Sequence, residues 1–315
     1  FFFKQKTAYE IKECDWSSDV CSSDLNFVYT GLAVAVAFRA GLFNIGVEGQ
    51  ATIAGIGIAF AALAMGRLPR GLALPAIIVV GAGFGAAWAF IPAWLQARRG
   101  SHIVITTIMF NFLASALLGW LLVEPLRAPG SMQPETRSFE AGALLPKFDD
   151  IAAWIGVPTT GSPLNASFLI ALLAAVAVYI VISRTRFGFR VRVLGANPAA
   201  ASYAGISVTQ TTVAAMLISG ALASGVALNE VVGAQGRLIL EFTGGYGFVG
   251  IAVALMGRNH PVGIVLAALL FGALYQGGAE LAFEMPRITR DMIILVQGLV
   301  VLMVGYLVVD KAGAH

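Results

Sequence analysis

The chain has 315 residues, of which 58% are apolar and only 12% charged, and its mean hydropathy is +0.83. Soluble domains carry about 25% charged residues, so the composition excludes an ordinary soluble fold. The net charge of +3 does not indicate nucleic-acid binding, because the basic residues lie in loops between apolar runs. These runs are continuous rather than alternating, which favours helices over a barrel. We expect an all-α, polytopic membrane helical bundle of about eight or nine spans.

The first 25 residues differ from everything that follows. They contain both cysteines, five acidic residues and three lysines, without the apolar centre or cleavage site of a signal peptide. The strings KQKTAYEI and DWSSDVCSSDL resemble the conceptual translation of a sequencing-library adapter. We therefore expect residues 1–25 to be an artefact outside the native fold, residues 26–315 to form the transmembrane domain, and the native N-terminus with its leading spans to be missing. The alternative is a polar cytosolic tail.

Nine apolar segments follow along the chain. A helix needs about 20 residues to cross the hydrocarbon core, and most of the segments approach or reach this length. In order they are residues 27–38, 51–65, 72–95, 103–123, 168–182, 212–228, 248–256, 262–282 and 293–309. Residues 248–256 are too few to span a bilayer alone, so we expect them to form a half-helix or to join the glycine-rich residues before them.

The loops between these segments differ in charge. Residues 96–101 and 183–210 carry arginines and no acid, whereas residues 124–165 form a long loop that contains prolines and several acids. Lys and Arg close to span ends mark the cytoplasmic face of a membrane protein. We therefore expect residues 96–101, residues 183–210 and the C-terminus on the cytoplasmic side, and residues 124–165 outside.

A polar segment, RAGLFNIGVEGQ, lies between the first two apolar runs, from Arg39 to Gln50. It contains the carboxylate of Glu48, the amides of Asn44 and Gln50, and three glycines. Acidic residues inside membrane spans are costly and are usually functional, and glycines permit a break in a helix. We expect Glu48 to be a ligand-facing or gating carboxylate at such a break. The alternative is a carboxylate at a cytoplasmic span end beside Arg39.

Further polar residues lie within or near other spans. Thr107 and Asn111 share a helix face, which suits either solute binding or interhelical packing. Glu230 belongs to a polar cluster after residues 212–228, and TGGYGF follows, which indicates a re-entrant segment or an ordinary external loop. Gln276 lies one turn before Glu280 and could face a pathway or pack. The candidates for the substrate pathway are Asn44, Glu48, Gln50, Thr107, Asn111, Glu230, Tyr246 and Gln276.

A short exposed helix is predicted in the arginine-rich segment 183–206. Asn197 is a favoured N-cap, Pro198 suits the first helical position, and Gly205 suits a helix end. The pattern predicts a helix over Pro198–Tyr203 that is flanked by arginines. Such a helix could dock into a groove of a soluble partner. The alternative is a basic loop that only sets membrane orientation.

The usual constellations of an enzyme are missing from the sequence. There are three histidines, no His/Cys cluster with metal spacing, no phosphate-binding P-loop and no Gly-x-Ser-x-Gly elbow. An intramembrane enzyme acting on a lipid-linked substrate would depend on Glu48 with His102. A stand-alone ion-coupled carrier would need no ATPase partner. We expect a transport subunit that is not itself an enzyme and binds no cofactor.

Four motifs in order carry a family resemblance, in residues 41–50, 101–111, 186–206 and 244–258. They read GLFNIGVEGQ, SHIVITTIMFN, RFGFRVRVLGANPAAASYAGI and GGYGFVGIAVALMGR. The motifs resemble those of permease subunits of nucleoside and simple-sugar ABC importers, within the branched-chain amino acid and ribose permease family. The similarity continues to the last apolar segment, and the chain departs from the family at residues 1–25.

The resemblance implies a function and a set of partners. A multi-pass permease of a bacterial or archaeal cytoplasmic membrane would import nucleosides or, as a second choice, simple sugars. It would pair with a second permease chain, cytoplasmic ATP-binding subunits that hold the ATP, and an extracytoplasmic substrate-binding lipoprotein. No nucleic acid is implied. The residues of the ATPase-coupling loop would be Arg186, Arg190, Arg192, Gly195, Asn197, Ala200 and Gly205.

Overall fold

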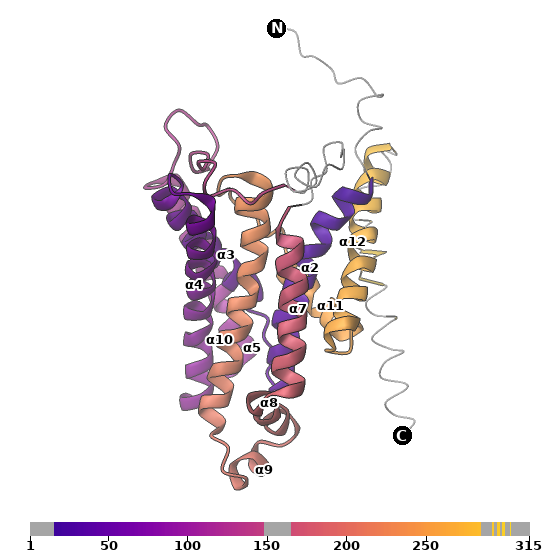
Figure 1. Ribbon diagram of the computed structural model, residues 1–315. Helices are drawn as coiled ribbons and strands as arrows, with labels where there is room; N and C mark the ends of the chain where they lie inside the picture. The colour runs from indigo at the N-terminus through magenta and orange to yellow at the C-terminus, as the bar shows by residue number, and fades with distance from the viewer. Residues whose placement is uncertain are drawn as a thin grey trace.

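The protein is a bundle of helices (Figure 1). The computed structural model describes residues 16–147 and 165–284, together with isolated positions between 292 and 303. Its helices are α2 (Trp16–Arg39), α3 (Val47–Met65), α4 (Arg70–Arg99), α5 (Ile103–Val123), α7 (Ser167–Arg184), α8 (Arg186–Ala196), α9 (Pro198–Tyr203), α10 (Val208–Ala227), the π-helix η1 (Leu228–Gln235), α11 (Tyr246–Met256) and α12 (Pro261–Glu284).

Each predicted apolar segment within these ranges corresponds to a helix, which confirms the all-α expectation. Residues 103–123 coincide with α5, and residues 248–256 form the greater part of the short helix α11. In the described residues, extended pairing is limited to two isolated bridges, Glu135 with Ile239 and Lys147 with Asn165. The predicted segment 293–309 lies almost entirely outside the described residues.

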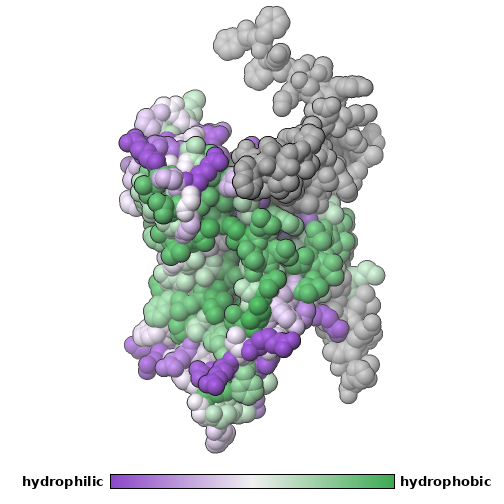
Figure 2. Space-filling view, in the orientation of Figure 1, coloured by the Kyte–Doolittle hydropathy of each residue, from purple (hydrophilic) through white to green (hydrophobic). Residues whose placement is uncertain are grey.

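The surface is that of a membrane protein. Five helices in the described part of the chain are long and apolar enough to cross a bilayer. Figure 2 shows a hydrophobic band around the middle of the bundle, with hydrophilic residues gathered at both ends. Large apolar side chains of the candidate spans are widely exposed, including Val79, Phe112 and Leu173. A soluble monomer rarely exposes so much apolar surface, so lipid is the expected neighbour.

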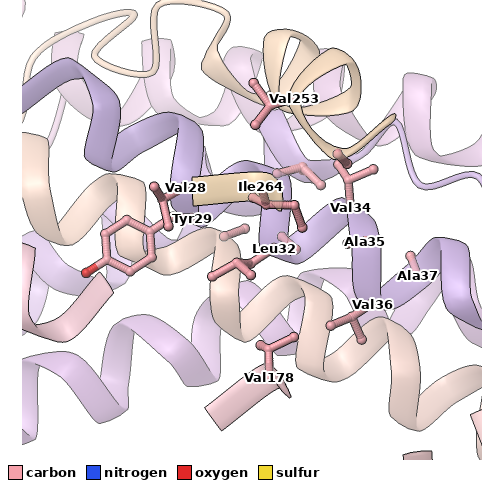
Figure 3. Close-up of a cluster of buried hydrophobic side chains, with 14 of the residues drawn as sticks. Val28, Tyr29, Leu32, Val34, Ala35, Val36, Ala37, Val178, Val253 and Ile264 are labelled. Atoms are coloured by element: carbon pink, nitrogen blue, oxygen red, sulfur yellow. The ribbon is translucent and has the colours of Figure 1, made fainter. Parts of the chain in front are cut away.

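Helix α2 lies at the centre of the bundle, packed against α10, α11 and α12 (Figure 1). Its side chains from Leu25 to Ala37 are almost all buried, and they form the core drawn in Figure 3. Small residues permit the close packing, since a Cβ on Gly225 would lie 2.1 Å from the ring of Tyr29. The Tyr29 hydroxyl donates a hydrogen bond to the Ser167 carbonyl at 2.8 Å.

Helices α4 and α10 cross at a pair of glycines. A Cβ on Gly85 would lie 2.3 Å from the carbonyl oxygen of Gly220, so only glycine allows the backbones to approach this closely. Small residues at helix contacts are typical of membrane bundles, where packing replaces the hydrophobic effect as the driving force.

The two ends of the bundle carry different loops. Helices α8 and α9 extend beyond the end where α4 meets α5, and residues 124–147 lie at the opposite end (Figure 1). Residues 96–101 and 183–210 therefore share one face, and residues 124–147 occupy the other, as the charge pattern predicts. We take the face of α8 and α9 as cytoplasmic, because its loops carry clustered arginines.

Candidate functional site

The connection between α2 and α3 re-enters the bundle. After Arg39 the chain turns at Gly41, whose φ of 74° is accessible mainly to glycine, and helix α3 begins only at Val47. The Asn44 side chain donates to the Ser219 hydroxyl at 2.9 Å. Ser219 lies well inside α10, about 16 Å from its cytoplasmic start at 1.5 Å per residue. The predicted break next to Glu48 is therefore present, and it lies beside the middle of the candidate span α10.

Amide side chains satisfy the backbone of this break. Asn44 and Gln50 exchange hydrogen bonds at 3.2 and 3.3 Å. The Asn111 amide nitrogen donates to the Ile45 carbonyl at 3.0 Å, while its oxygen accepts from the Gly49 N–H at 2.9 Å. Irregular backbone at membrane depth needs such partners, because lipid provides none. The polar atoms of these side chains thus bond to the protein, and contact with solute remains a prediction.

Thr107 packs against the same break without hydrogen bonding to it. Its hydroxyl donates to the carbonyl of Ile103 in its own helix at 2.8 Å. A Cβ on Gly46 would lie 3.0 Å from the Thr107 Cβ, so α5 packs closely against the break. Thr107 and Asn111 therefore face the same neighbour, as their spacing predicts, and both hold α5 against residues 45–49.

Glu48 binds the start of α11. Its carboxylate accepts hydrogen bonds from the Gly245 N–H at 3.0 Å and the Gly247 N–H at 2.7 Å. A helix begins with unpaired N–H groups and a partial positive charge, and a carboxylate stabilises both. Glu48 lies in the first turn of α3 and makes no ion pair with Arg39. A ligand-facing or gating role for Glu48 stays a prediction.

The segment that leads into α11 is re-entrant. Residues 236–245 are not helical, and Leu238 and Phe242 within them are buried. The Phe242 ring packs on α3, where a Cβ on Gly55 would lie 2.3 Å from its Cζ atom. Glu241 has a φ of 55°, which is unusual for a residue with a side chain. The segment pairs with residues 136–139 of the outer loop at one end and packs Phe242 into the bundle at the other, which is consistent with the re-entrant expectation.

Arg39 holds the other end of α11. Its Nε and Nη2 atoms donate to the carbonyl of Asn259, in the turn that follows α11, at 3.2 and 3.0 Å. A cation at the C-terminal end of a helix complements the helix dipole. We call residues 39–48 the clamp segment, because Arg39 binds one end of the half-helix α11 and Glu48 binds the other.

Two short helices, α8 and α9, form the predicted coupling segment. The Asn197 side chain accepts from the N–H groups of Ala199 and Ala200 at 2.9 and 3.2 Å, so Asn197 is the N-cap of α9. Gly205 has a φ of 73° just after α9. The predicted helix Pro198–Tyr203 is confirmed with the same bounds. Its surface is open to a partner, and Tyr203 is 94% exposed.

The coupling segment touches the clamp segment at Gly195. A Cβ there would lie 2.3 Å from the carbonyl oxygen of Arg39 and 3.1 Å from the nitrogen of Gly41. Arg186 and Arg190 are exposed on α8. Arg192 is half-buried and donates to the carbonyl of Ile182 near the end of α7, so it stabilises that helix end.

The remaining predicted pathway residues lie towards the outer end of the bundle. Glu230 belongs to η1, which continues α10, so it lies inside the span and not in a loop after it. Its carboxylate accepts from the Asn26 amide at 2.6 Å. The rings of Tyr246 and Tyr275 lie 6.1 Å apart, and Gln276 is half-buried beside Tyr275 on α12. The sequence prediction missed Asn26 and Tyr275. Asn26 stands between residues 1–25 and the apolar segment 27–38, and Tyr275 lies within the apolar segment 262–282.

These features define a class of protein. A helical membrane bundle with a break between α2 and α3, a half-helix α11 and an exposed arginine-containing segment, α8 and α9, is suited to moving a solute across a membrane with the help of a soluble partner.

Comparison with known proteins identifies the family. Residues 25–305 match the family described as the permease component of the branched-chain amino acid transport system. The chain is 35% identical to the glucose ABC transporter permease protein TsgB13 of Haloferax volcanii, over 87% of this chain and 72% of that protein. It is 37% identical to the guanosine ABC transporter permease protein NupP of Bacillus subtilis, over 86% of this chain and 76% of that protein.

A third relative is the nucleoside ABC transporter permease protein NupB of Lactococcus lactis, which is 36% identical over 84% of this chain and 70% of that protein. The chain therefore belongs to this family of ABC transporter permeases and is an integral membrane transport subunit. The family resemblance seen in the four sequence motifs is confirmed.

Proposed function

We propose that this chain is the permease subunit of an importer for nucleosides, with simple sugars as the second candidate. We choose nucleosides because the chain is 36–37% identical to permeases named for nucleosides and guanosine. The similar identity to a glucose permease keeps sugars as the alternative. A nucleoside contains a sugar ring, so both candidates present hydroxyl groups to the pathway.

The energy source lies on partner chains in this proposal. The sequence has no phosphate-binding P-loop, so ATP is hydrolysed by cytoplasmic subunits that dock on α8 and α9. The exposed Phe189 and Tyr203 and the exposed Arg186 and Arg190 give these helices apolar and basic contact points. A second permease chain completes the pathway, and an extracytoplasmic binding lipoprotein delivers the solute.

The clamp segment gives the proposal a route for coupling. Movement of α8 is transmitted at Gly195 to the backbone of Arg39 and Gly41, because no side chain separates them. Arg39 and Glu48 then carry the movement to both ends of α11. A half-helix that is gripped at both ends can shift as a rigid unit, which is a common way for packed helices to switch between arrangements.

Uptake by the assembled transporter tests the proposed function. Proteoliposomes holding the permease, its ATP-binding subunits and its binding lipoprotein are supplied with ATP on the cytoplasmic face and with labelled guanosine, uridine or glucose on the other. We expect ATP-dependent uptake of guanosine. Excess unlabelled uridine should inhibit this uptake, whereas excess glucose should not. Glucose uptake alone would select the sugar alternative. Uptake driven by an ion gradient without ATP would overturn the proposal.

A further inference from the structure

The π-helix at the outer end of α10 presents two consecutive polar residues to α2. Asn26 donates from its amide nitrogen to Glu230 at 2.6 Å, and its oxygen accepts from the Asn229 amide at 3.1 Å. In a regular α-helix consecutive residues point about 100° apart and do not share a partner face. Single π-turns inside α-helices occur frequently at functional sites. The widened turn therefore brings Asn229 and Glu230 together at Asn26.

The two residues differ in how fully they are bonded. Asn229 is completely buried, and its oxygen accepts from the Asn165 amide at 3.1 Å and the Ser167 hydroxyl at 2.6 Å. Glu230 is half-buried, and within residues 16–147 and 165–284 its only donor is Asn26. A carboxylate offers about four acceptor positions. Glu230 thus retains acceptor capacity in a membrane segment, where unsatisfied polar groups are costly.

An aromatic cluster lies next to Asn26, the residue that donates to this carboxylate. The Phe27 ring packs edge-on against Tyr246 and Tyr275, with centroid distances of 5.4 and 6.1 Å. Phe27 is fully buried, while both tyrosines are half-buried and therefore offer ring surface. The rings of Tyr246 and Tyr275 lie 6.1 Å apart. Apolar and aromatic walls with a few fixed polar groups are the usual lining of a small-molecule site.

Charge narrows the class of ligand. The two ion pairs in the described parts of the chain are Arg67–Glu140 and Arg237–Glu135, and neither involves Glu230. An acid without a paired cation repels phosphates and carboxylates, so nucleotides and acidic sugars are disfavoured. Hydroxyl groups can fill the open acceptor positions, and a flat ring can lie against a tyrosine.

We propose that Glu230, Asn26, Tyr246 and Tyr275 form a solute-binding site for a neutral molecule with vicinal hydroxyl groups next to a flat ring. Glu230 accepts from the hydroxyl pair, Asn26 fixes the carboxylate, and the tyrosine rings contact the flat ring. The site lies one turn or so from the outer end of η1, where a delivered solute would enter. This inference rests on the proposed import of nucleosides, and it names the residues that hold the solute.

A thermodynamic cycle that combines one change in the protein with one change in the ligand tests the site. The probes are labelled guanosine and 2′,3′-dideoxyguanosine, which lacks the vicinal hydroxyls, and the protein is the nucleotide-free permease–ATPase complex in nanodiscs. Glu230→Gln keeps the size and one acceptor for Asn26 but removes the charge. We expect it to weaken guanosine binding about tenfold, as for a lost hydrogen bond to a charged group. Dideoxyguanosine should bind the wild type about tenfold more weakly than guanosine, and Glu230→Gln should weaken it no further.

Matched variants separate binding from folding. Glu140→Gln changes a surface carboxylate, and Tyr179→Phe changes a tyrosine on α7; both should bind guanosine like the wild type. Tyr275→Phe keeps the ring and should change guanosine affinity less than twofold, whereas Tyr275→Leu should weaken it severalfold. These tyrosine variants keep the test informative if Glu230→Gln does not fold.

The outcomes distinguish the two proposals. If Glu230→Gln weakens both probes equally, or neither, the site assignment is wrong although nucleoside import stands. If the wild-type complex neither binds nor takes up any nucleoside in the parallel proteoliposome assay, the proposed function itself fails.

Discussion

Two intramembrane carboxylates, Glu48 and Glu230, have opposite surroundings. Glu48 is bonded to two backbone N–H groups at the start of α11. Glu230 has a single side-chain donor among the described residues, Asn26, which is followed in α2 by Phe27 of the aromatic cluster with Tyr246 and Tyr275. Both acids would be considered functional by the same rule for acids in membranes. The number and kind of donors separates a carboxylate that holds the fold from one that is open to a ligand.

Removal of the Glu48 carboxylate should have the largest effect. Glu48→Ala leaves the N–H groups of Gly245 and Gly247 unpaired inside the membrane and removes the charge that stabilises the helix start. We expect a loss of about 2–5 kcal/mol of stability, visible as a large fall in the thermal unfolding temperature of the purified complex. Glu140→Ala is the control and should melt like the wild type. If the melting temperature of Glu48→Ala were unchanged while uptake was lost, Glu48 would contact solute or act in gating. The proposed difference between Glu48 and Glu230 would then be wrong.

A side chain at Gly195 should break the link between the coupling and clamp segments. Gly195→Val would force α8 away from the carbonyl of Arg39. We expect uptake to fall at least about tenfold while ATP hydrolysis stays within about twofold, since packed interfaces switch rather than deform. Both rates are measured on the same proteoliposomes. Gly119→Val is the control, because nothing lies within 4 Å of a Cβ there; tight coupling in Gly195→Val would refute the route through the clamp segment.

Charge reversal on α8 should have a smaller effect and should distinguish two arginines. Arg190 is exposed, so Arg190→Glu should weaken binding of the ATP-binding subunits by up to about fivefold, as expected for exposed charge contacts, with no change in melting. Arg192 also bonds the end of α7, so Arg192→Glu should lower the melting temperature as well. Affinity and melting are measured on detergent-purified permease. If the two variants behave alike, Arg192 has no separate role in the fold.

The smallest expected effect concerns Asp24, the next-to-last residue of the segment 1–25. Asp24 is buried against Gly272, and neither carboxylate oxygen has a partner in the part of the chain that the structure describes. We propose that residues 1–25 are foreign to the fold, and an unpartnered buried acid is what a foreign segment would introduce. Asp24→Leu should raise the melting temperature by about 2–4 °C. A lower melting temperature would mean that Asp24 belongs to the native packing.

Local features of this fold could be predicted from the sequence, because nearby residues determine them. Apolar length identified the spans, so α5 matches its predicted bounds, and Asn197, Pro198 and Gly205 identified α9 with its cap. α2 extends beyond residues 27–38, because the polar stretch before it contains no proline or glycine to end a helix.

Partners that are distant in the sequence could not be predicted. Glu48 bonds to Gly247, 199 residues away, and Asn26 bonds to Glu230, 204 residues away. Periodicity and capping patterns report which face of a helix is apolar, but they do not report which helix will pack there. The role of Glu48 at α11 and the place of Glu230 inside η1 therefore emerged only from the folded structure.

The most direct test measures Glu48→Gln and Glu230→Gln in the same permease–ATPase preparation, by melting temperature and by guanosine affinity. The account predicts that Glu48→Gln lowers the melting temperature clearly and leaves guanosine affinity within about twofold, since one amide oxygen replaces two carboxylate acceptors. It predicts that Glu230→Gln weakens guanosine about tenfold with little change in melting. The reverse pattern, with Glu48 controlling affinity and Glu230 controlling melting, would contradict the account.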